Sequence, residues 1–208
     1  FAEHRAFEAR HARPHYPQAA GFANRPEPNR RLRIGYLSSD LNGHPVGRNL
    51  IPMIEAHDRD NFDLFFYAHI SGPDAVSRRF HAQAAGWRQI VGMSDRDVAE
   101  AIRADGIDIL VSLAGRFDLN RPQVCAFRPA PVQISFHDPA TSGMEVMDYL
   151  IADRVLVPPH PEERFPERPL RLPSSNGAVR LDLFEHTPYR STPVPELTSG
   201  ESASVPPS

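Results

Sequence analysis

The 208-residue chain contains 23 arginines and no lysine. This absence excludes a Schiff-base lysine and a P-loop lysine from the chain. The single cysteine, Cys125, excludes an internal disulfide, and no group of cysteines and histidines has zinc-site spacing. A lone cysteine fits a reducing compartment, so we expect a cytoplasmic protein.

Long apolar runs are also missing. No stretch approaches the roughly 18 apolar residues of a membrane span, and the charged first ten residues do not resemble a secretory leader. The net charge of −3 and the pI of about 6.4 argue against binding to nucleic acid or anionic membranes through bulk charge. We therefore expect neither nucleic acid nor a membrane as a partner.

Prolines are concentrated near the end of the chain. Eleven of the 22 follow Val157, and dense proline disfavours regular elements because it fixes φ and removes a hydrogen-bond donor. The pattern predicts an ordered core over about residues 31–153 and a disordered, low-complexity Ser/Pro-rich tail over residues 173–208. Residues 1–12 fit a short helix with Ala6 and Phe7 on its apolar side, and residues 13–30 fit a linker.

Between these ends, apolar runs alternate with amphipathic stretches. Ser94 and Asp97 have the spacing of a helix capping box. The alternation predicts an α/β fold, a Rossmann-like doubly wound parallel sheet, whose ligand cleft lies beyond the carboxyl ends of the strands. The predicted strands are residues 32–37, 62–68, 87–91, 107–113, 132–136 and 147–152. The predicted helices are residues 46–56, 74–85, the stretch from Ser94 to Gly106, and residues 122–127.

The turn after the first predicted strand has one glycine, Gly43, so the G-x-G-x-x-G fingerprint of dinucleotide binding is absent. A G-x-S-x-G nucleophile elbow is absent as well. The turn does contain His44, followed by Pro45 at the start of a predicted helix. Its imidazole could hydrogen-bond a diphosphate or an acceptor hydroxyl; the alternative is a loop histidine that caps the helix or packs.

Three segments carry a resemblance to a known family: LRIGYLSSDLNGHPVGRNL at residues 32–50, AIRADGIDILVSLAG and FRPAPVQ within residues 101–133, and PATSGMEVMDYLIAD at residues 139–153. In order and spacing they resemble the protein O-linked N-acetylglucosamine transferase and SPINDLY family, glycosyltransferase family 41. The resemblance ends at Leu172.

The resemblance implies a catalytic region of two Rossmann-like halves that face a cleft, as in inverting two-domain glycosyltransferases, preceded by tetratricopeptide repeats. Residues 31–172 match the amino-terminal catalytic half, and residues 1–30 correspond to the junction after the repeats. The implied partners are a UDP-sugar donor, an acceptor protein and a missing carboxy-terminal catalytic half that supplies most of the grip on the uridine diphosphate. Neither a cofactor nor a metal is implied.

By the same resemblance, His44 matches the cleft histidine and is the expected catalytic residue, beside the sugar donor and the incoming hydroxyl. Thr141, Ser142 and Gly143, with Pro139 before them, match the cleft loop after the fifth strand and are the expected substrate-binding residues.

Other matched residues have structural expectations. Asp40 is expected to hold its loop, Arg128 to brace neighbouring loops through a fork of hydrogen bonds, and Asp148 to be structural. The sequence departs from the family at Asp138, where the family has tyrosine, and at Ala140, where it has glycine.

The resemblance favours a protein O-GlcNAc transferase-like enzyme that transfers a sugar to Ser/Thr hydroxyls, incomplete in this chain. Two alternatives stay open: a non-catalytic protein- or peptide-binding domain, and an inactive truncated fragment, with a frame shift as one origin of the tail. The sequence leaves open whether the sugar is N-acetylglucosamine or fucose.

Overall fold

A seven-stranded parallel sheet organises the part of the chain that the computed structural model describes, which is residues 2–18, 21–27, 29–136, 141–153, 157–158 and 165–172. These residues belong to one unit, Phe1–Ser174. The predicted tail lies outside the described residues. None of the described helices is long and apolar enough to cross a bilayer.

The strand order is β3-β2-β1-β4-β5-β6-β7, and each neighbouring pair is parallel. The strands are β1 Leu32–Ser38, β2 Phe62–Ala68, β3 Gly86–Gln89, β4 Ile109–Leu113, β5 Val132–Phe136, β6 Tyr149–Ala152 and β7 Arg168–Arg171. The helical elements are α1 Ala2–Phe7, η1 Glu8–Ala12, η2 Arg13–His15, α2 Pro45–Glu55, α3 Ala75–Ala82, α4 Asp95–Ala104 and η3 Pro122–Phe127.

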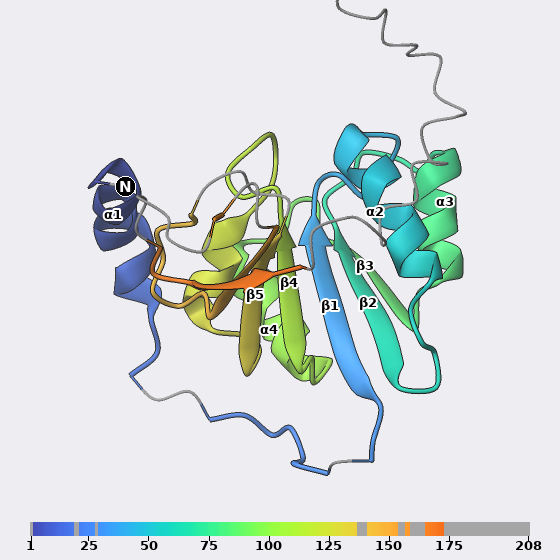
Figure 1. The fold of residues 1–208 in the computed structure, drawn as a ribbon, viewed down its shortest axis with the longest axis horizontal. Coiled ribbons are helices and arrows are strands. Elements are labelled where there is room, and N and C mark those ends of the chain that lie inside the picture. The colour runs from blue at the N-terminus through green and yellow to red at the C-terminus, as the bar shows by residue number, and fades with distance from the viewer. Residues whose placement is uncertain are drawn as a thin grey trace, which may run out of the picture. The chain divides into compact units, whose positions relative to one another are not determined.

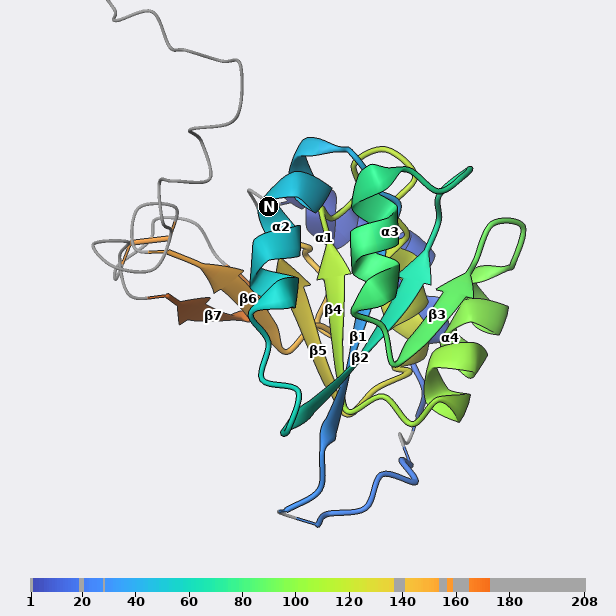
Figure 2. The same ribbon diagram turned by 90° about the vertical axis from the view of Figure 1, so that its right-hand side faces the viewer.

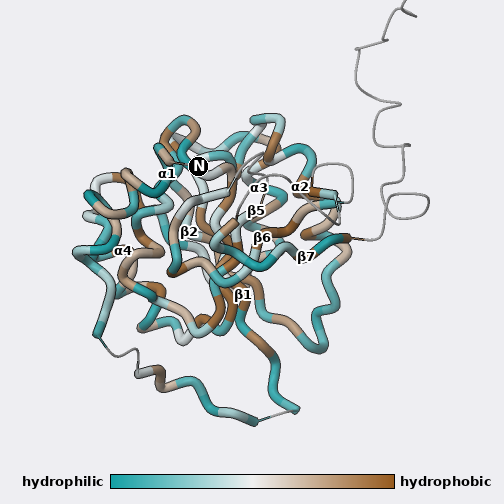
Figure 3. The backbone as a smooth tube through the Cα atoms, turned by 60° about the vertical axis from the view of Figure 1, so that its left-hand side comes forward, coloured by the Kyte–Doolittle hydropathy of each residue, from teal (hydrophilic) through white to brown (hydrophobic). Residues whose placement is uncertain are grey.

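Helices cover both faces of the sheet, as predicted. Helices α2 and α3 lie together on one face and α4 lies on the other (Figures 1 and 2). Two core clusters match these faces: one contains Tyr36 and Phe80, and the other contains Leu37, Ile102 and Cys125. Burial raises the pKa of the Cys125 thiol to about 12, so this cysteine packs as an apolar group. The apolar segments accordingly lie along the central strands (Figure 3).

Helix starts follow local sequence signals. Ser94 caps α4, and its Oγ accepts a hydrogen bond from Asp97 N at 3.1 Å, while the Asp97 carboxylate accepts one in return. Asp74 and Ser77 form the same reciprocal box at the start of α3. The predicted box at Ser94 is confirmed.

Strand β7 was missed by the sequence analysis, and the ordered core predicted to end near Asp153 extends to Arg171. The strand contains Pro169 in a proline-rich stretch, which disfavours a strand prediction. It adds to the sheet as an edge, where a missing N–H is tolerated, and pairs in parallel with β6.

The amino-terminal helix is confirmed, but its predicted burial pattern is wrong. Ala6 is exposed and Phe7 is half-buried, whereas Glu8 is fully buried together with Ala12. A buried carboxylate is tolerated only when it is paired and hydrogen-bonded. Arg5 and Arg13 form ion pairs with Glu8, and its Oε1 accepts hydrogen bonds from Tyr16 Oη and Glu145 N, both at 2.9 Å.

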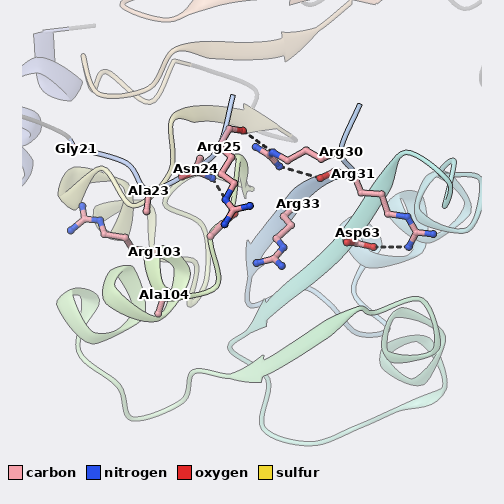
Figure 4. Close-up of a pocket in the computed structure, with 11 residues that line it drawn as sticks. Gly21, Ala23, Asn24, Arg25, Arg30, Arg31, Arg33, Asp63, Arg103 and Ala104 are labelled. Atoms are coloured by element: carbon pink, nitrogen blue, oxygen red, sulfur yellow. Dashed lines mark hydrogen bonds and ion pairs between the residues drawn. The ribbon is translucent and has the colours of Figure 1, made fainter. Parts of the chain in front are cut away.

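Arginines gather at the amino ends of the strands, around a pocket of about 510 Å³ (Figure 4). Most of these arginines are engaged within the protein: Arg31 points to Asp63 at 3.2 Å, and Arg30 holds the buried Asp108 with two hydrogen bonds of 2.5 and 2.6 Å. Burial opposes ionisation of Asp108, but the hydrogen bonds from Arg30, Arg33 N and Asn24 outweigh it and hold its pKa below the ordinary value. This end of the sheet is therefore fastened by a paired carboxylate.

At the opposite end, helix α2 packs tightly on the loop that follows β1. A Cβ on Gly47 would lie 2.2 Å from Asn42 O and 2.4 Å from Asp40 O. Only glycine lets the first turn of α2 approach this backbone, so Gly47 fixes the course of the loop.

Replacing Gly47 with alanine is therefore expected to destabilise the chain by about 1–3 kcal/mol, because the methyl group overlaps two carbonyl oxygens. Urea unfolding of the 208-residue chain measures this. Gly72→Ala is the matched control, since nothing lies within 4 Å of its added Cβ. Equal midpoints for the two variants would contradict the close packing at Gly47.

Acid is expected to weaken the fold through Asp108, because its pKa is lower in the folded than in the unfolded chain. The stabilisation is complete above the ordinary aspartate pKa of about 3.9 and is lost as the pH falls through the lower folded-state value. Urea unfolding at about pH 6 and about pH 3 should show a larger loss of stability in the wild type than in Asp108→Asn. The same loss in both proteins would count against the assignment.

Candidate functional site

The order of the strands reverses between β1 and β4, which makes this the candidate ligand site. The chain runs from β1 outward to β2 and β3, then returns to β4 on the other side of β1. In such sheets, ligands bind beyond the carboxyl ends of the strands where the order reverses. Two loops meet there, residues 39–44 after β1 and residues 114–121 after β4.

A side-chain amide joins these two loops. Asn120 Oδ1 accepts hydrogen bonds from Ser38 Oγ at 2.8 Å and Ser39 N at 2.9 Å. Its Nδ2 donates to Asp40 Oδ2 at 2.8 Å. Asp40 is 3% exposed, and it holds its loop as expected.

His44 lies at the candidate site as the N-cap of α2. Its Nδ1 accepts a hydrogen bond from Val46 N at 3.3 Å. A neutral imidazole that accepts at Nδ1 carries its proton on Nε2. The alternative capping role is thus present in the structure, and it leaves Nε2 as the ring nitrogen that does not cap the helix.

Two carboxylates flank this imidazole. Asp40 Oδ1 lies 3.7 Å from Nδ1, and Asp118 Oδ2 lies 3.6 Å from Nε2. Asp118 is in the left-handed region with φ of 52°, and its side chain is 63% exposed. The negative charge of Asp118 disfavours a diphosphate at Nε2 and favours a neutral sugar or hydroxyl there.

Asp40, His44 and Asp118 also form the one group within the described residues that brings three metal-ligating side chains together, with donor atoms within 4.8 Å of one another. Asp40 and His44 already use potential metal-ligand atoms in hydrogen bonds within the protein. Both Asp40 oxygens accept hydrogen bonds, and His44 Nδ1 caps α2. The absence of a metal therefore stays a prediction.

The predicted substrate-binding loop is held inward. Thr141 and Ser142 are 5% and 4% exposed, and Glu167 is 2% exposed. The Glu167 carboxylate accepts hydrogen bonds from Thr141 Oγ1 at 2.5 Å, Ser142 N at 2.6 Å and Ser142 Oγ. In this arrangement the two hydroxyls bond to a buried carboxylate, and their contact with substrate stays a prediction.

The amino-terminal helix covers the same loop. A Cβ on Gly143, whose φ is 71°, would lie 2.4 Å from His4 Cβ. Arg116, from the loop after β4, donates to Ser142 O at 2.5 Å and lies over the Phe7 ring at 4.0 Å. Pro139, the other predicted substrate-binding residue, lies outside the described residues.

His44 and the Thr141–Gly143 loop share the carboxyl edge of the sheet, but β4 lies between their strands. Within the described residues no hydrogen bond or ion pair joins them directly. Arg128 braces neighbouring loops, as expected, but at the amino ends of β5 and β6: it donates to Pro131 O, Asp148 Oδ1 and Val146 O.

Asp118 and Asn120 lie in the loop after the fourth predicted strand, where the sequence predicts the cleft, but neither they nor Glu167 were singled out from the sequence. A signal existed for Asn120 and Asp118, because the classical Rossmann strand order sets the loop after the fourth strand beside the first. Nothing in the sequence marks Glu167, which lies 25 residues beyond Ser142 in a stretch rich in proline and charge.

The parallel sheet with helices on both faces defines a Rossmann-like α/β protein, and the reversal of its strand order places the candidate site between β1 and β4. A family model described as glycosyl transferase family 41 matches residues 11–180. The chain therefore belongs to glycosyltransferase family 41, which confirms the predicted family.

Curated relatives agree with this family. SPINDLY from Solanum lycopersicum, named as a probable UDP-N-acetylglucosamine–peptide N-acetylglucosaminyltransferase, is 34% identical over 165 residues, which cover 77% of this chain and 18% of that protein. SEC from Arabidopsis thaliana, named as a probable enzyme of the same kind, is 33% identical over 146 residues, 69% of this chain and 15% of that protein. The chain thus spans less than a fifth of either relative.

A solved structure is also similar. A lysine-to-methionine mutant of the Thermobaculum terrenum O-GlcNAc transferase is 41% identical to this chain with a TM-score of 0.76. The match covers 81% of this chain and 32% of that one.

Glu167→Gln is expected to destabilise the chain by about 1–3 kcal/mol, because the new amide sets a donor against the donors of the Thr141–Ser142 loop. Chemical unfolding measures the change. The exposed Glu100 on α4 supplies the control variant Glu100→Gln. If both variants unfold at the wild-type midpoint, Glu167 does not hold the loop.

Proposed function

We propose that this chain is the amino-terminal half of the catalytic region of a protein O-GlcNAc transferase-like enzyme, which transfers a sugar from a UDP-sugar to Ser/Thr hydroxyls of proteins. Membership of family 41 and the activity named for the relatives support this function. The supporting observation in the structure is the position of His44 at the reversal point of the sheet, with Nε2 beside Asp118.

In this mechanism, the oxygen of an acceptor hydroxyl bonds to the anomeric carbon of the donor while the bond to the uridine diphosphate breaks on the opposite side, so the configuration inverts and the hydroxyl proton is lost to the leaving diphosphate or to water. His44 donates a hydrogen bond from Nε2 to the sugar or to the hydroxyl oxygen. Because its Nδ1 lone pair already accepts from Val46 N, His44 orients its partner rather than removing a proton.

The negative charge of the donor's diphosphate indicates which half of the catalytic region binds it. The candidate site between β1 and β4 has the carboxylates of Asp40 and Asp118 beside His44, and these repel a diphosphate. The amino end of α2 contributes only a partial positive charge. The leaving diphosphate is therefore bound mainly by a carboxy-terminal half that completes the cleft, and this half is the partner that activity requires.

Sugar-donor hydrolysis and peptide glycosylation are the experiments that test this proposal, on the chain alone and on the chain combined with a carboxy-terminal half. Turnover is expected only in the combination. Peptide binding without turnover would favour a non-catalytic binding domain, and neither binding nor turnover would favour an inactive fragment.

In the active combination, His44→Ala is expected to lower the rate about tenfold or more, because an oriented donor at the reacting groups is lost. His81→Ala, at an exposed position on α3, is the control and should keep the wild-type rate. An unchanged rate in His44→Ala would remove His44 from the catalytic machinery.

A further inference from the structure

Asn120 makes a set of hydrogen bonds that require both an acceptor and a donor on one side chain. Ser39 N needs an acceptor, and Asn120 Oδ1 provides it at 2.9 Å. The ionised Asp40 carboxylate needs a donor, and Asn120 Nδ2 provides it at 2.8 Å. An aspartate at position 120 could satisfy Ser39 but would face Asp40 with a second carboxylate, and an apolar residue could satisfy neither.

These bonds fix the direction of the Asp40 carboxylate. Asn120 holds Oδ2, and Ser39 Oγ donates to Oδ1 at 3.0 Å. With both oxygens bonded, the carboxylate cannot rotate about its Cβ–Cγ bond without losing a partner. Its Oδ1 is thereby kept 3.7 Å from His44 Nδ1.

The candidate site contains other charges. Asp118 faces Nε2 of the imidazole from the loop after β4. At the neighbouring Gly43, Arg48 of α2 donates to the carbonyl oxygen and Asp74, the N-cap of α3, accepts from the backbone N–H. These groups touch the turn, whereas Asp40 is the buried charge that faces the ring itself.

We propose that Asn120 is a positioning residue: it links the ends of β1 and β4, orients the Asp40 carboxylate, and so sets the charge that lies beside the His44 imidazole. The inference rests on the proposed function in so far as His44 takes part in sugar transfer. The effect on the imidazole can be tested without any turnover.

The first experiment uses the 208-residue chain labelled with ¹⁵N-histidine. Ring nitrogen and ring proton resonances are recorded for the wild type and for Asn120→Asp, with His44→Ala used to assign the His44 signals. Asn61→Asp is the matched control, because Asn61 also donates to an aspartate, Asp58 Oδ2 at 2.6 Å, but precedes β2 at the other end of the sheet.

The His44 resonances are expected to shift in Asn120→Asp and to stay at their wild-type positions in Asn61→Asp. Equal His44 spectra in the two variants overturn the inference. Far-ultraviolet circular dichroism establishes that both variants are folded, and Asn120→Ser, with a smaller change and no added charge, replaces Asn120→Asp if the latter does not fold.

The second experiment measures kinetics in the chain combined with a carboxy-terminal half. Asn120→Asp is expected to lower kcat about ten- to a hundredfold with little change in the KM for the donor, because a displaced charge beside a reacting group acts on the transition state. The double variant Asn120→Asp with Asp40→Asn re-forms the hydrogen bond with its partners exchanged. It should recover the unfolding midpoint but not kcat, since the negative charge of residue 40 no longer lies beside the His44 imidazole.

Recovery of kcat together with stability would show that Asn120 only connects the two loops by hydrogen bonds, and would overturn the inference. If the wild-type combination has no turnover at all, the proposed function fails, while the histidine resonances still decide whether Asn120 sets the surroundings of the ring.

Discussion

The hydrogen bonds of one amide hold the candidate site together. At the point where the strand order reverses, β1 and β4 are neighbours, but their chains continue in different directions, and the sheet itself does not link the loops beyond them. Asn120 spans this gap by bonding to Ser38, Ser39 and Asp40 at once. The buried charge of Asp40, and with it the surroundings of His44, depends on that bridge.

The loop that contains Asn120 also connects the two parts of the predicted site. Asp118 lies beside His44, and Arg116 donates to the carbonyl oxygen of Ser142 in the loop that follows β5. The turn after β1 and the loop at Thr141–Gly143 therefore meet through the loop after β4 rather than directly. Glu167 and the amino-terminal helix both contact the Thr141–Gly143 loop: Glu167 accepts from Ser142 N, and His4 lies against Gly143.

Much of the fold was predictable, because its signals are local. The apolar run at β4 and the capping box of Ser94 and Asp97 report their own backbone conformation. The elements that the sequence did not predict depend on residues distant in the chain. Strand β7 contains Pro169 and forms only because β6 offers an edge. Glu8 reads as a surface residue and is buried because partners as distant as Glu145 bond to it.

The sequence by itself determined the alternation of strands and helices, the family to which the chain belongs, and the location of His44 after the first strand, since periodicity and motifs lie in contiguous residues. Only the tertiary structure decided that Asn120 would face Asp40, that Glu167 would hold Thr141 and Ser142, and that Nδ1 of His44 would be occupied. Those outcomes depend on strands separated in sequence lying side by side, and hydrogen bonds that act over a few ångströms leave no trace in the spacing of residues along the chain.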